Sequence, residues 1–350
     1  MNDAREPKRI CIIRLSAIGD VVMASGLIPA LRQRYPNARL SWLVEPAAAP
    51  LLKHNPGLDE VIVWPRGEWR ALWRERRYRE LWRRLRAFRR ELRARRFDLV
   101  LDAQGLLKSA VWAWLSGAPR RLGLIAREGS HLLMTERVVP PDDGDKPIGS
   151  EYRYLARYLG APDDAFRLDL AVGAEPRAAA RAKLRTGGVA GRFAALCPFT
   201  TRPQKHWFEE RWAELARQLA QQGLTPVLLG GPGDTEAATR IAAQAPGLIN
   251  LAGGLKLDET VAVIADASLL IGVDTGLTHM GTALRIPTVA LFGSTRPYRD
   301  ARSARTVILY EQLPCSPCRR HPTCDGRFDC MAAHTVAGVL AAAQRVLATP

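Results

Sequence analysis

The amino-acid sequence predicts an α/β protein made of two doubly wound, Rossmann-like domains that face a cleft. Its 350 residues are long for one domain and comfortable for two. Short apolar runs alternate with segments of helical periodicity, which is typical of parallel sheets covered by helices. The alternation occurs in two series, separated at residues 168–176, so we expect two similar domains.

The apolar runs place the strands of both domains. The first series predicts strands at Arg9–Arg14, Leu40–Val44, Val61–Trp64, Leu99–Asp102 and Arg121–Leu124. The second predicts strands at Phe193–Cys197, Pro226–Leu229, Ile249–Leu251, Leu269–Gly272, Thr288–Phe292 and Thr306–Leu309. We place the N-terminal domain at residues 1–168 and the C-terminal domain at 177–333. Residues 334–350 are expected to form a helix, for which packing back on the N-terminal domain is one open arrangement.

Charge and apolar content limit the function classes. The formal net charge of +16 is concentrated, because residues 66–96 hold fourteen Arg and four Glu. So localised a field indicates an anionic partner, which could be a phosphorylated substrate, an acidic membrane surface or nucleic acid. No apolar run reaches membrane-spanning length, and the polar N-terminus is unlike a signal peptide, so a cytoplasmic protein is expected.

The Arg-rich segment has apolar side chains at helical spacing, among them Trp69, Trp73, Trp82 and Phe88. A basic amphipathic helix with Trp near its apolar face is typical of a membrane interface. A core-packed helix with a solvated charged face is the alternative, and the sequence leaves both open.

The segment Arg14–Asp20 follows the first predicted strand. Gly19 permits a tight turn into a helix, which would place Asp20 near the helix N-terminus. Asp20 is either a general base or an acid that stabilises the first helical turn, where acids are favoured anyway. The glycine-rich dinucleotide-binding fingerprint is absent, which argues against a dinucleotide-dependent enzyme.

Two loops of the second domain could hold a nucleotide. Thr200, Thr201 and Lys205 follow its first strand and could bind a diphosphate through hydroxyls and charge. Asp234 and Glu236 follow the next strand, where an acid could hold ribose hydroxyls. Either loop could instead be an ordinary polar turn, and glycine-rich turns with acids are common.

A third loop begins with Asp274, Thr275 and Gly276, at the start of a predicted helix. Backbone N–H groups at a helix start bind anions, and His279 lies one helical turn further on. His279 alone could be a core or capping histidine. Together with the Lys205 loop, this turn favours phosphate binding.

Cys315, Cys318, Cys324 and Cys330 place four thiols within sixteen residues. Four thiols could hold a structural zinc ion, although their spacing does not closely match a zinc finger or ribbon. Free thiols are the alternative, and six cysteines in a chain of this size do not argue for a secreted disulfide scaffold.

In combination and order, five motifs resemble those of the bacterial ADP-heptose:lipopolysaccharide heptosyltransferases, which have the GT-B fold. They are Ser16-Ala-Ile-Gly-Asp20, Asp102-Ala-Gln-Gly-Leu-Leu-Lys108, Thr200-Thr-Arg-Pro-Gln-Lys-His-Trp207, Val273-Asp-Thr-Gly-Leu-Thr-His279 and Leu291-Phe-Gly-Ser294. The resemblance spans nearly the whole chain and is closest to heptosyltransferase I, whereas the Cys-rich segment is similar to heptosyltransferase II-like members.

The resemblance implies an inverting transfer of heptose from ADP-heptose to the Kdo and inner-core region of lipopolysaccharide, with no cofactor and no essential metal. It implies that Asp20 is the catalytic base, in an acceptor-binding N-terminal domain, and that Lys205 stabilises the leaving diphosphate. It assigns donor binding to Thr200, Thr201, Asp234, Glu236, Asp274, Thr275, Gly276 and His279, and acceptor binding to Ser16, Gly19, Arg83, Arg84, Gln104 and Lys108.

The implied partners are ADP-heptose and Kdo-lipid A, an acceptor anchored in the inner membrane. A peripheral position on the cytoplasmic face of that membrane is therefore expected. The alternatives are a GT-B glycosyltransferase of the same family with another acceptor or nucleotide sugar, including a heptosyltransferase II-like enzyme, and, more remotely, a nucleic-acid-binding protein. No stacking platform or nucleic-acid-binding module is visible, so nucleic acid is not expected as a partner.

Overall fold

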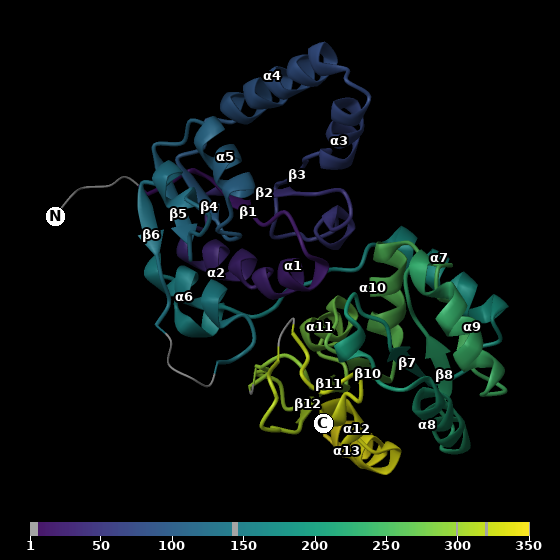
Figure 1. The fold of residues 1–350 in the computed structure, drawn as a ribbon. Helices are drawn as coiled ribbons and strands as arrows, with labels where there is room; N and C mark the ends of the chain where they lie inside the picture. The colour runs from purple at the N-terminus through teal and green to yellow at the C-terminus, as the bar shows by residue number, and fades with distance from the viewer. Residues whose placement is uncertain (1–5, 142–145, 299, 319–320, 350) are drawn as a thin grey trace. The chain divides into compact units, whose positions relative to one another are not determined.

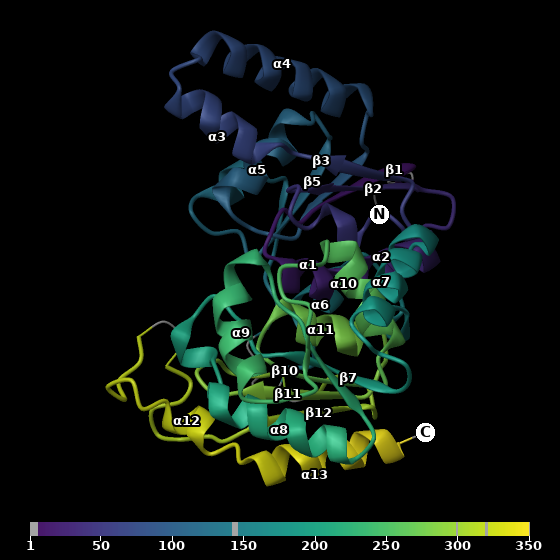
Figure 2. The same cartoon turned by 90° about the vertical axis from the view of Figure 1, so that its right-hand side faces the viewer.

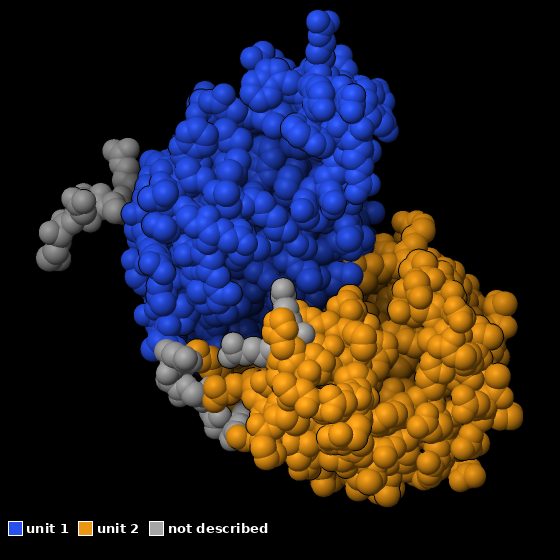
Figure 3. Space-filling model, in the orientation of Figure 1, with its two compact units in different colours: residues 1–143, 149–171 blue, residues 144–148, 172–350 orange. Residues whose placement is uncertain are grey.

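The computed structural model describes residues 6–141, 146–298, 300–318 and 321–349. The chain divides into two compact units (Figure 3). Unit 1 comprises residues 1–143 and 149–171, and unit 2 comprises residues 144–148 and 172–350. Each unit contains a six-stranded sheet in which all neighbouring strands are parallel, so the two doubly wound domains expected from the sequence are confirmed.

In unit 1, helices lie on both faces of the sheet, with α3, α4 and α5 on one face and α1, α2 and α6 on the other (Figure 1). The strands are β1 Arg9–Ile13, β2 Arg39–Val44, β3 Glu60–Val63, β4 Leu99–Asp102, β5 Arg120–Leu124 and β6 Glu136–Val138. The helices are α1 Ile18–Ala24, α2 Leu27–Arg34, α3 Arg66–Arg74, α4 Tyr78–Ala94, α5 Leu107–Leu115 and α6 Ser150–Tyr158. Because both faces are covered, the central strands are almost wholly buried and apolar.

In unit 2, α8 and α13 lie on one side of the sheet and α10 and α11 on the other (Figure 2). The strands are β7 Phe193–Cys197, β8 Thr225–Leu228, β9 Ile249–Asn250, β10 Leu269–Val273, β11 Thr288–Phe292 and β12 Thr306–Tyr310. The helices are α7 Ala174–Thr186, α8 Glu209–Gln221, α9 Thr235–Ala243, α10 Leu257–Asp266, α11 Gly276–Ala283, α12 Asp329–Ala332 and α13 Val336–Ala348.

Both sheets have the same connectivity. The strand order is β3-β2-β1-β4-β5-β6 in unit 1 and β12-β11-β10-β7-β8-β9 in unit 2. In both sheets, the first three strands run from the middle of the sheet to one edge. The chain then returns to the middle, and the last three strands run to the other edge. The connectivity therefore reverses between β1 and β4, and again between β7 and β10. Ligands of such sheets bind beyond the carboxyl ends of the strands at this switch point.

Three details differ from the sequence prediction. The structure adds an edge strand, β6, which pairs with β5. The Arg-rich segment is two helices, because the chain breaks between α3 and α4 where Arg76 has a left-handed φ of 58°. The C-terminal helix, α13, which the sequence prediction placed outside the C-terminal domain, belongs to unit 2, where Val339, Leu340 and Val346 are buried in the core against that unit's own sheet.

Within the described ranges, no helix is both long enough and apolar enough to cross a membrane.

Candidate active site

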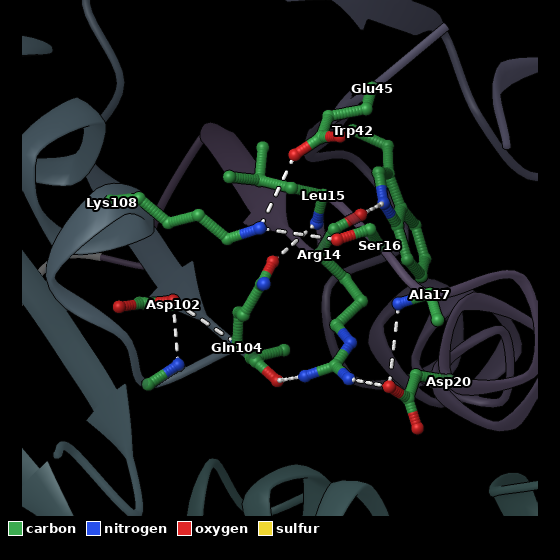
Figure 4. Close-up of polar contacts among 12 residues, drawn as sticks. Arg14, Leu15, Ser16, Ala17, Asp20, Trp42, Glu45, Asp102, Gln104 and Lys108 are labelled. Carbon is green, nitrogen blue, oxygen red and sulfur yellow. Dashed lines mark hydrogen bonds and ion pairs between the residues drawn. The ribbon is translucent and has the colours of Figure 1, made fainter. Parts of the chain in front are cut away.

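The switch point of unit 1 brings together the loops that follow β1 and β4 (Figure 4). Arg14 joins the two loops, because its Nη1 donates to the carbonyl oxygen of Ala103 at 3.1 Å while its Nη2 forms an ion pair with Asp20. The amide of Leu15 donates to Oε1 of Gln104 at 2.9 Å. Gln104, an expected acceptor residue, therefore also holds the loop after β1 in place.

Asp20 is the third residue of α1 and uses one carboxylate oxygen for local structure. Its Oδ2 pairs with Arg14 and accepts the amide hydrogen of Ala17 at 3.4 Å. Its Oδ1 has no partner among the described residues, and the side chain is 38% exposed. Asp20 thus stabilises the first turn of α1, as one interpretation of the sequence expected. Its Oδ1 oxygen stays available to accept a proton. Gly19 is the second residue of α1 and its φ is not positive, so the turn into the helix does not depend on a left-handed glycine at this position.

Lys108 links the same switch point to the start of the Arg-rich segment. Its Nζ donates to Oγ of Ser16 at 3.2 Å and to Oε1 of Glu45 at 3.3 Å. Arg66, the first residue of α3, donates to the same Glu45 oxygen at 3.3 Å. Glu45 therefore lies between two cations, a position that the sequence analysis missed because nothing in the motif after β2 distinguishes it.

Asp102 ends β4 with a buried carboxylate. Its Oδ1 accepts the amide hydrogens of Gln104 at 3.1 Å and Gly105 at 3.0 Å, which shapes the loop. Burial raises the pKa of Asp102 to about 6, although these backbone bonds favour the ionised form. Gly105 has a φ of 66°, and a Cβ atom at this position would lie 2.1 Å from the carbonyl oxygen of Leu124. The loop can therefore take this path only with glycine.

The switch point of unit 2 brings together the loops after β7 and β10. Nζ of Lys205 lies 2.5 Å from Oδ2 of Asp274, which also accepts a hydrogen bond from Oγ1 of Thr295 at 2.5 Å. Oγ1 of Thr200 donates to the backbone carbonyl of Asp274 at 3.4 Å. Burial raises the pKa of Asp274, but His279 and Lys205 outweigh burial and hold that pKa well below its ordinary value. Lys205 and Asp274 are therefore a charged, partly shielded pair.

Helix α11 starts beside this pair. Thr275 is its N-cap and Gly276 its first residue, and no described side chain caps the helix. His279 is buried, with Nε2 3.6 Å from Oδ1 of Asp274 and Nδ1 3.2 Å from the hydroxyl of Tyr298. The hydroxyl and imidazole thus fix each other beside the first turn of α11. Tyr298 and Thr295 come from the loop after β11 and were missed from the sequence.

The remaining expected donor residues are placed differently. Thr201 is exposed on the loop that carries Thr200. Asp234 accepts the amide hydrogen of Gly231 at 2.8 Å, so its carboxylate closes its own turn. Glu236 is exposed and pairs with Arg240 one helical turn later at 3.0 Å. Among the described residues, no contact joins Asp234 or Glu236 to the Lys205–Asp274 pair.

The expected acceptor residues Arg83 and Arg84 face different surroundings. Arg84 pairs with Glu68 and Glu80, both at 2.8 Å, which is the solvated, paired state of the core-packed alternative. Arg83 is exposed and has no ion pair in the part of the chain that the structure describes. Of these two adjacent residues, only Arg83 keeps its charge available.

Cys315, Cys318, Cys324 and Cys330 carry free thiols, and the latter two are buried. In residues 6–141, 146–298, 300–318 and 321–349, no three or more His, Cys, Asp or Glu side chains are gathered closely enough to hold a metal ion. The structure therefore offers no assembled ligand set for the zinc interpretation.

The comparisons with known proteins agree with this geometry. The sequence model of the protein family named glycosyltransferase family 9 (heptosyltransferase) matches residues 82–327 of this chain. Lipopolysaccharide heptosyltransferase 1 of Pseudomonas aeruginosa is 32% identical over 318 residues, 89% of this chain and 86% of that protein. Lipopolysaccharide heptosyltransferase 2 of Escherichia coli is 30% identical over 327 residues, which are 87% of this chain and 90% of that protein. The solved Escherichia coli heptosyltransferase WaaC with ADP has a TM-score of 0.76 and 26% identity, covering 97% of this chain and 99% of that chain.

Two parallel six-stranded sheets with polar constellations at both switch points define a glycosyltransferase of the GT-B fold. Asp20 lies in unit 1, and Lys205, His279 and the start of α11 lie in unit 2. The chain belongs to glycosyltransferase family 9, the heptosyltransferases. This confirms the family expected from the sequence. Heptosyltransferases 1 and 2 are similar to the chain to nearly the same degree, so the comparisons identify the family without selecting an acceptor.

Proposed function

We propose that the protein transfers heptose from ADP-heptose to the Kdo and inner-core region of lipopolysaccharide, with Kdo-lipid A as acceptor. The observation that carries this proposal is the difference between the two switch points. The one in unit 1 offers a carboxylate oxygen without a partner, on Asp20, among the described residues. The one in unit 2 offers a lysine, a histidine and an uncapped helix N-terminus.

Asp20 is the base of a single displacement. The acceptor hydroxyl oxygen attacks the anomeric carbon of heptose, and its proton passes to Oδ1 of Asp20. The bond from that carbon to the diphosphate oxygen breaks, and ADP leaves with the electron pair. Inversion in one step needs one base and no protein nucleophile. Arg14 holds the other carboxylate oxygen, so it orients Asp20 for this role.

Unit 2 stabilises the leaving ADP. Negative charge grows on the diphosphate as the bond breaks, so fixed cations and N–H donors strengthen their hold in the transition state. Lys205 and the first-turn amides of α11 are such donors. The same groups supply the charge that a metal ion would otherwise provide. ADP as the nucleotide is supported by the similarity to the WaaC structure that was solved with ADP.

The acceptor is the finer part of the proposal. Kdo-lipid A is an anionic lipid of the inner membrane, and the cations Lys108, Arg66 and Arg83 lie in unit 1 together with the base. A second candidate, transfer to heptosyl-Kdo-lipid A, is favoured by the similarity to heptosyltransferase 2.

The decisive assay mixes purified enzyme with ADP-heptose and either Kdo-lipid A or heptosyl-Kdo-lipid A, and measures ADP release and the mass of the product. We expect turnover with Kdo-lipid A, unchanged in excess EDTA. Turnover only with heptosyl-Kdo-lipid A would select the second candidate, and no ADP release with either acceptor would overturn the proposal. The metal content of the purified protein should be measured alongside, because chelation could also remove a metal bound by the cysteines.

A further inference from the structure

Helix α4 packs one face on the core of unit 1, and another of its faces carries arginine side chains. Leu81, Leu85, Phe88 and Leu92 pack toward the core of unit 1. On a different face, side chains at spacings of three and four residues border an open pocket of about 590 Å³. We name this set the Arg/Trp stripe, and its members are Arg79, Trp82, Arg83, Arg86, Arg89, Arg90 and Arg93.

The arginines of the stripe are not paired with any carboxylate of the residues that the structure describes. Within the described residues, no ion pair joins any of them to Asp or Glu, whereas Arg77 and Arg84 of the same segment pair with Glu75, Glu80 and Glu68. At about 100° per residue, Glu80 and Glu91 project on the flank of α4 away from the stripe. The acids of α4 are therefore segregated from it. Like charges one turn apart repel each other, so the stripe carries an electrostatic cost that an anionic partner would offset.

Exposed aromatic side chains accompany these charges. Trp73 is 63% exposed, Tyr78 49% and Trp82 54%. Trp73 and Tyr78 contact each other edge to face across the turn between α3 and α4, with ring centroids 5.2 Å apart. The guanidinium of Arg86 lies over the ring of Trp82 at 5.0 Å. Trp and Tyr beside Arg form the combination that is enriched where proteins meet the headgroups of a bilayer.

The hairpin of α3 and α4 is firmly attached to unit 1. Trp69, Phe88 and Trp112 of α5 form edge-to-face pairs with centroids 5.0–5.7 Å apart. Arg66, at the start of α3, shares Glu45 with Lys108, which in turn binds Ser16 in the loop before Asp20. A surface that binds the hairpin is therefore coupled by direct contacts to the loop that carries the proposed base.

We propose that the Arg/Trp stripe, with Trp73 and Tyr78, is the surface through which this protein docks on an anionic lipid bilayer. The choice of a bilayer over other polyanions rests on the proposed function, because the proposed acceptor is embedded in one. The arginines hold the anionic headgroups, and the exposed rings enter the interface. Arg84 has no part in docking, since its charge is already used by Glu68 and Glu80.

The test is co-sedimentation of the full-length protein with vesicles of phosphatidylcholine alone or with 30% phosphatidylglycerol. The docking variant replaces Arg79, Arg86, Arg90 and Arg93 with Gln. The matched control replaces Arg137, Arg167, Arg185 and Arg192, which are also exposed, so both variants lower the formal net charge from +16 to +12.

We expect wild type and control to bind the anionic vesicles alike and the docking variant to bind at least about tenfold more weakly, since each Arg at an anionic leaflet contributes about fivefold. Replacing Trp73 and Trp82 with Ser should remove the binding that survives 0.5 M salt, because apolar contacts are not screened. Equal loss in the control, or wild-type binding by the docking variant, would overturn the proposal. Binding to single-stranded DNA but not to vesicles would overturn it in favour of a nucleic-acid partner.

Vesicle binding needs neither ADP-heptose nor turnover, so it can succeed or fail independently of the proposed function. Measuring turnover of a delipidated, soluble Kdo acceptor then distinguishes a loss of membrane docking from a loss of transferase activity. The docking variant should match wild type there, and a loss of turnover with intact vesicle binding would instead place these arginines at the acceptor.

Discussion

Nζ of Lys205 and Oδ2 of Asp274 lie 2.5 Å apart, joining the loops that follow β7 and β10. Asp274 also accepts a hydrogen bond from Thr295 and lies beside His279, so its carboxylate positions three groups at once. In the proposed reaction, Lys205 is therefore held in place before the nucleotide binds, and it needs no reorganisation when charge develops on the leaving group.

Replacing Lys205 with Ala should lower kcat/KM for the donor by about 10²- to 10³-fold, the usual effect of removing one electrostatic stabiliser. The substitution also leaves Asp274 with an unbalanced charge, so the double variant Lys205→Ala, Asp274→Asn is the informative control. If the double variant recovers activity toward wild type, Lys205 serves only to neutralise Asp274. Activity as low as that of Lys205→Ala supports a direct role. Steady-state kinetics with ADP-heptose provide the measurement.

Asp20→Asn should lower kcat by about 10² to 10⁴, as expected for a lost general base, while ADP binding stays close to wild type. Asn can still accept the amide hydrogen of Ala17, so this variant removes the base while keeping the helix contact. Calorimetry with ADP and turnover assays measure the two effects. A loss of less than about tenfold would mean that Asp20 serves mainly to stabilise α1.

Asp102 should make the protein less stable as the pH rises from about 4 to 6. Its native pKa is raised to about 6 from 3.8, so in this window the folded state holds a proton that the unfolded state has released. The free energy of unfolding therefore falls with rising pH, by up to about 3 kcal/mol once the pH exceeds the native pKa.

Comparison with Asp102→Asn isolates this effect, because other carboxylates titrate equally in both proteins. Urea unfolding at pH 4 and pH 7 should show the variant gaining stability relative to wild type at the higher pH. A stability difference that is the same at both pH values would contradict the assignment.

The sequence predicted the buried strands well because apolar runs bounded by turns carry that information locally. It missed β6, since Glu136 and Arg137 make two of its three residues charged and its place at the sheet edge leaves no apolar run. It also missed the break at Arg76, because no glycine or proline marks the left-handed residue.

Pairings between distant residues account for the other differences. Helical periodicity placed Arg83 and Arg84 on a basic helix, but it did not reveal that Arg84 pairs with Glu68, because Glu68 lies on another helix. Thr295 and Tyr298 follow the motif at Leu291-Phe-Gly-Ser294, yet only the folded sheet brings their loop to His279 and Asp274. Local patterns identify which loops meet at a switch point, whereas the partners of each side chain depend on tertiary packing.

The carbonyl oxygen of Leu124 leaves no room for a side chain at position 105. Even alanine would have to displace the main chain of β5 as well as adopt a left-handed φ, so no compensating change of a neighbouring side chain could accommodate it. Genetic drift at this codon is therefore confined to synonymous changes, whereas an exposed position such as Arg137 tolerates most replacements. A library of random variants selected for function should retain a single amino acid at position 105.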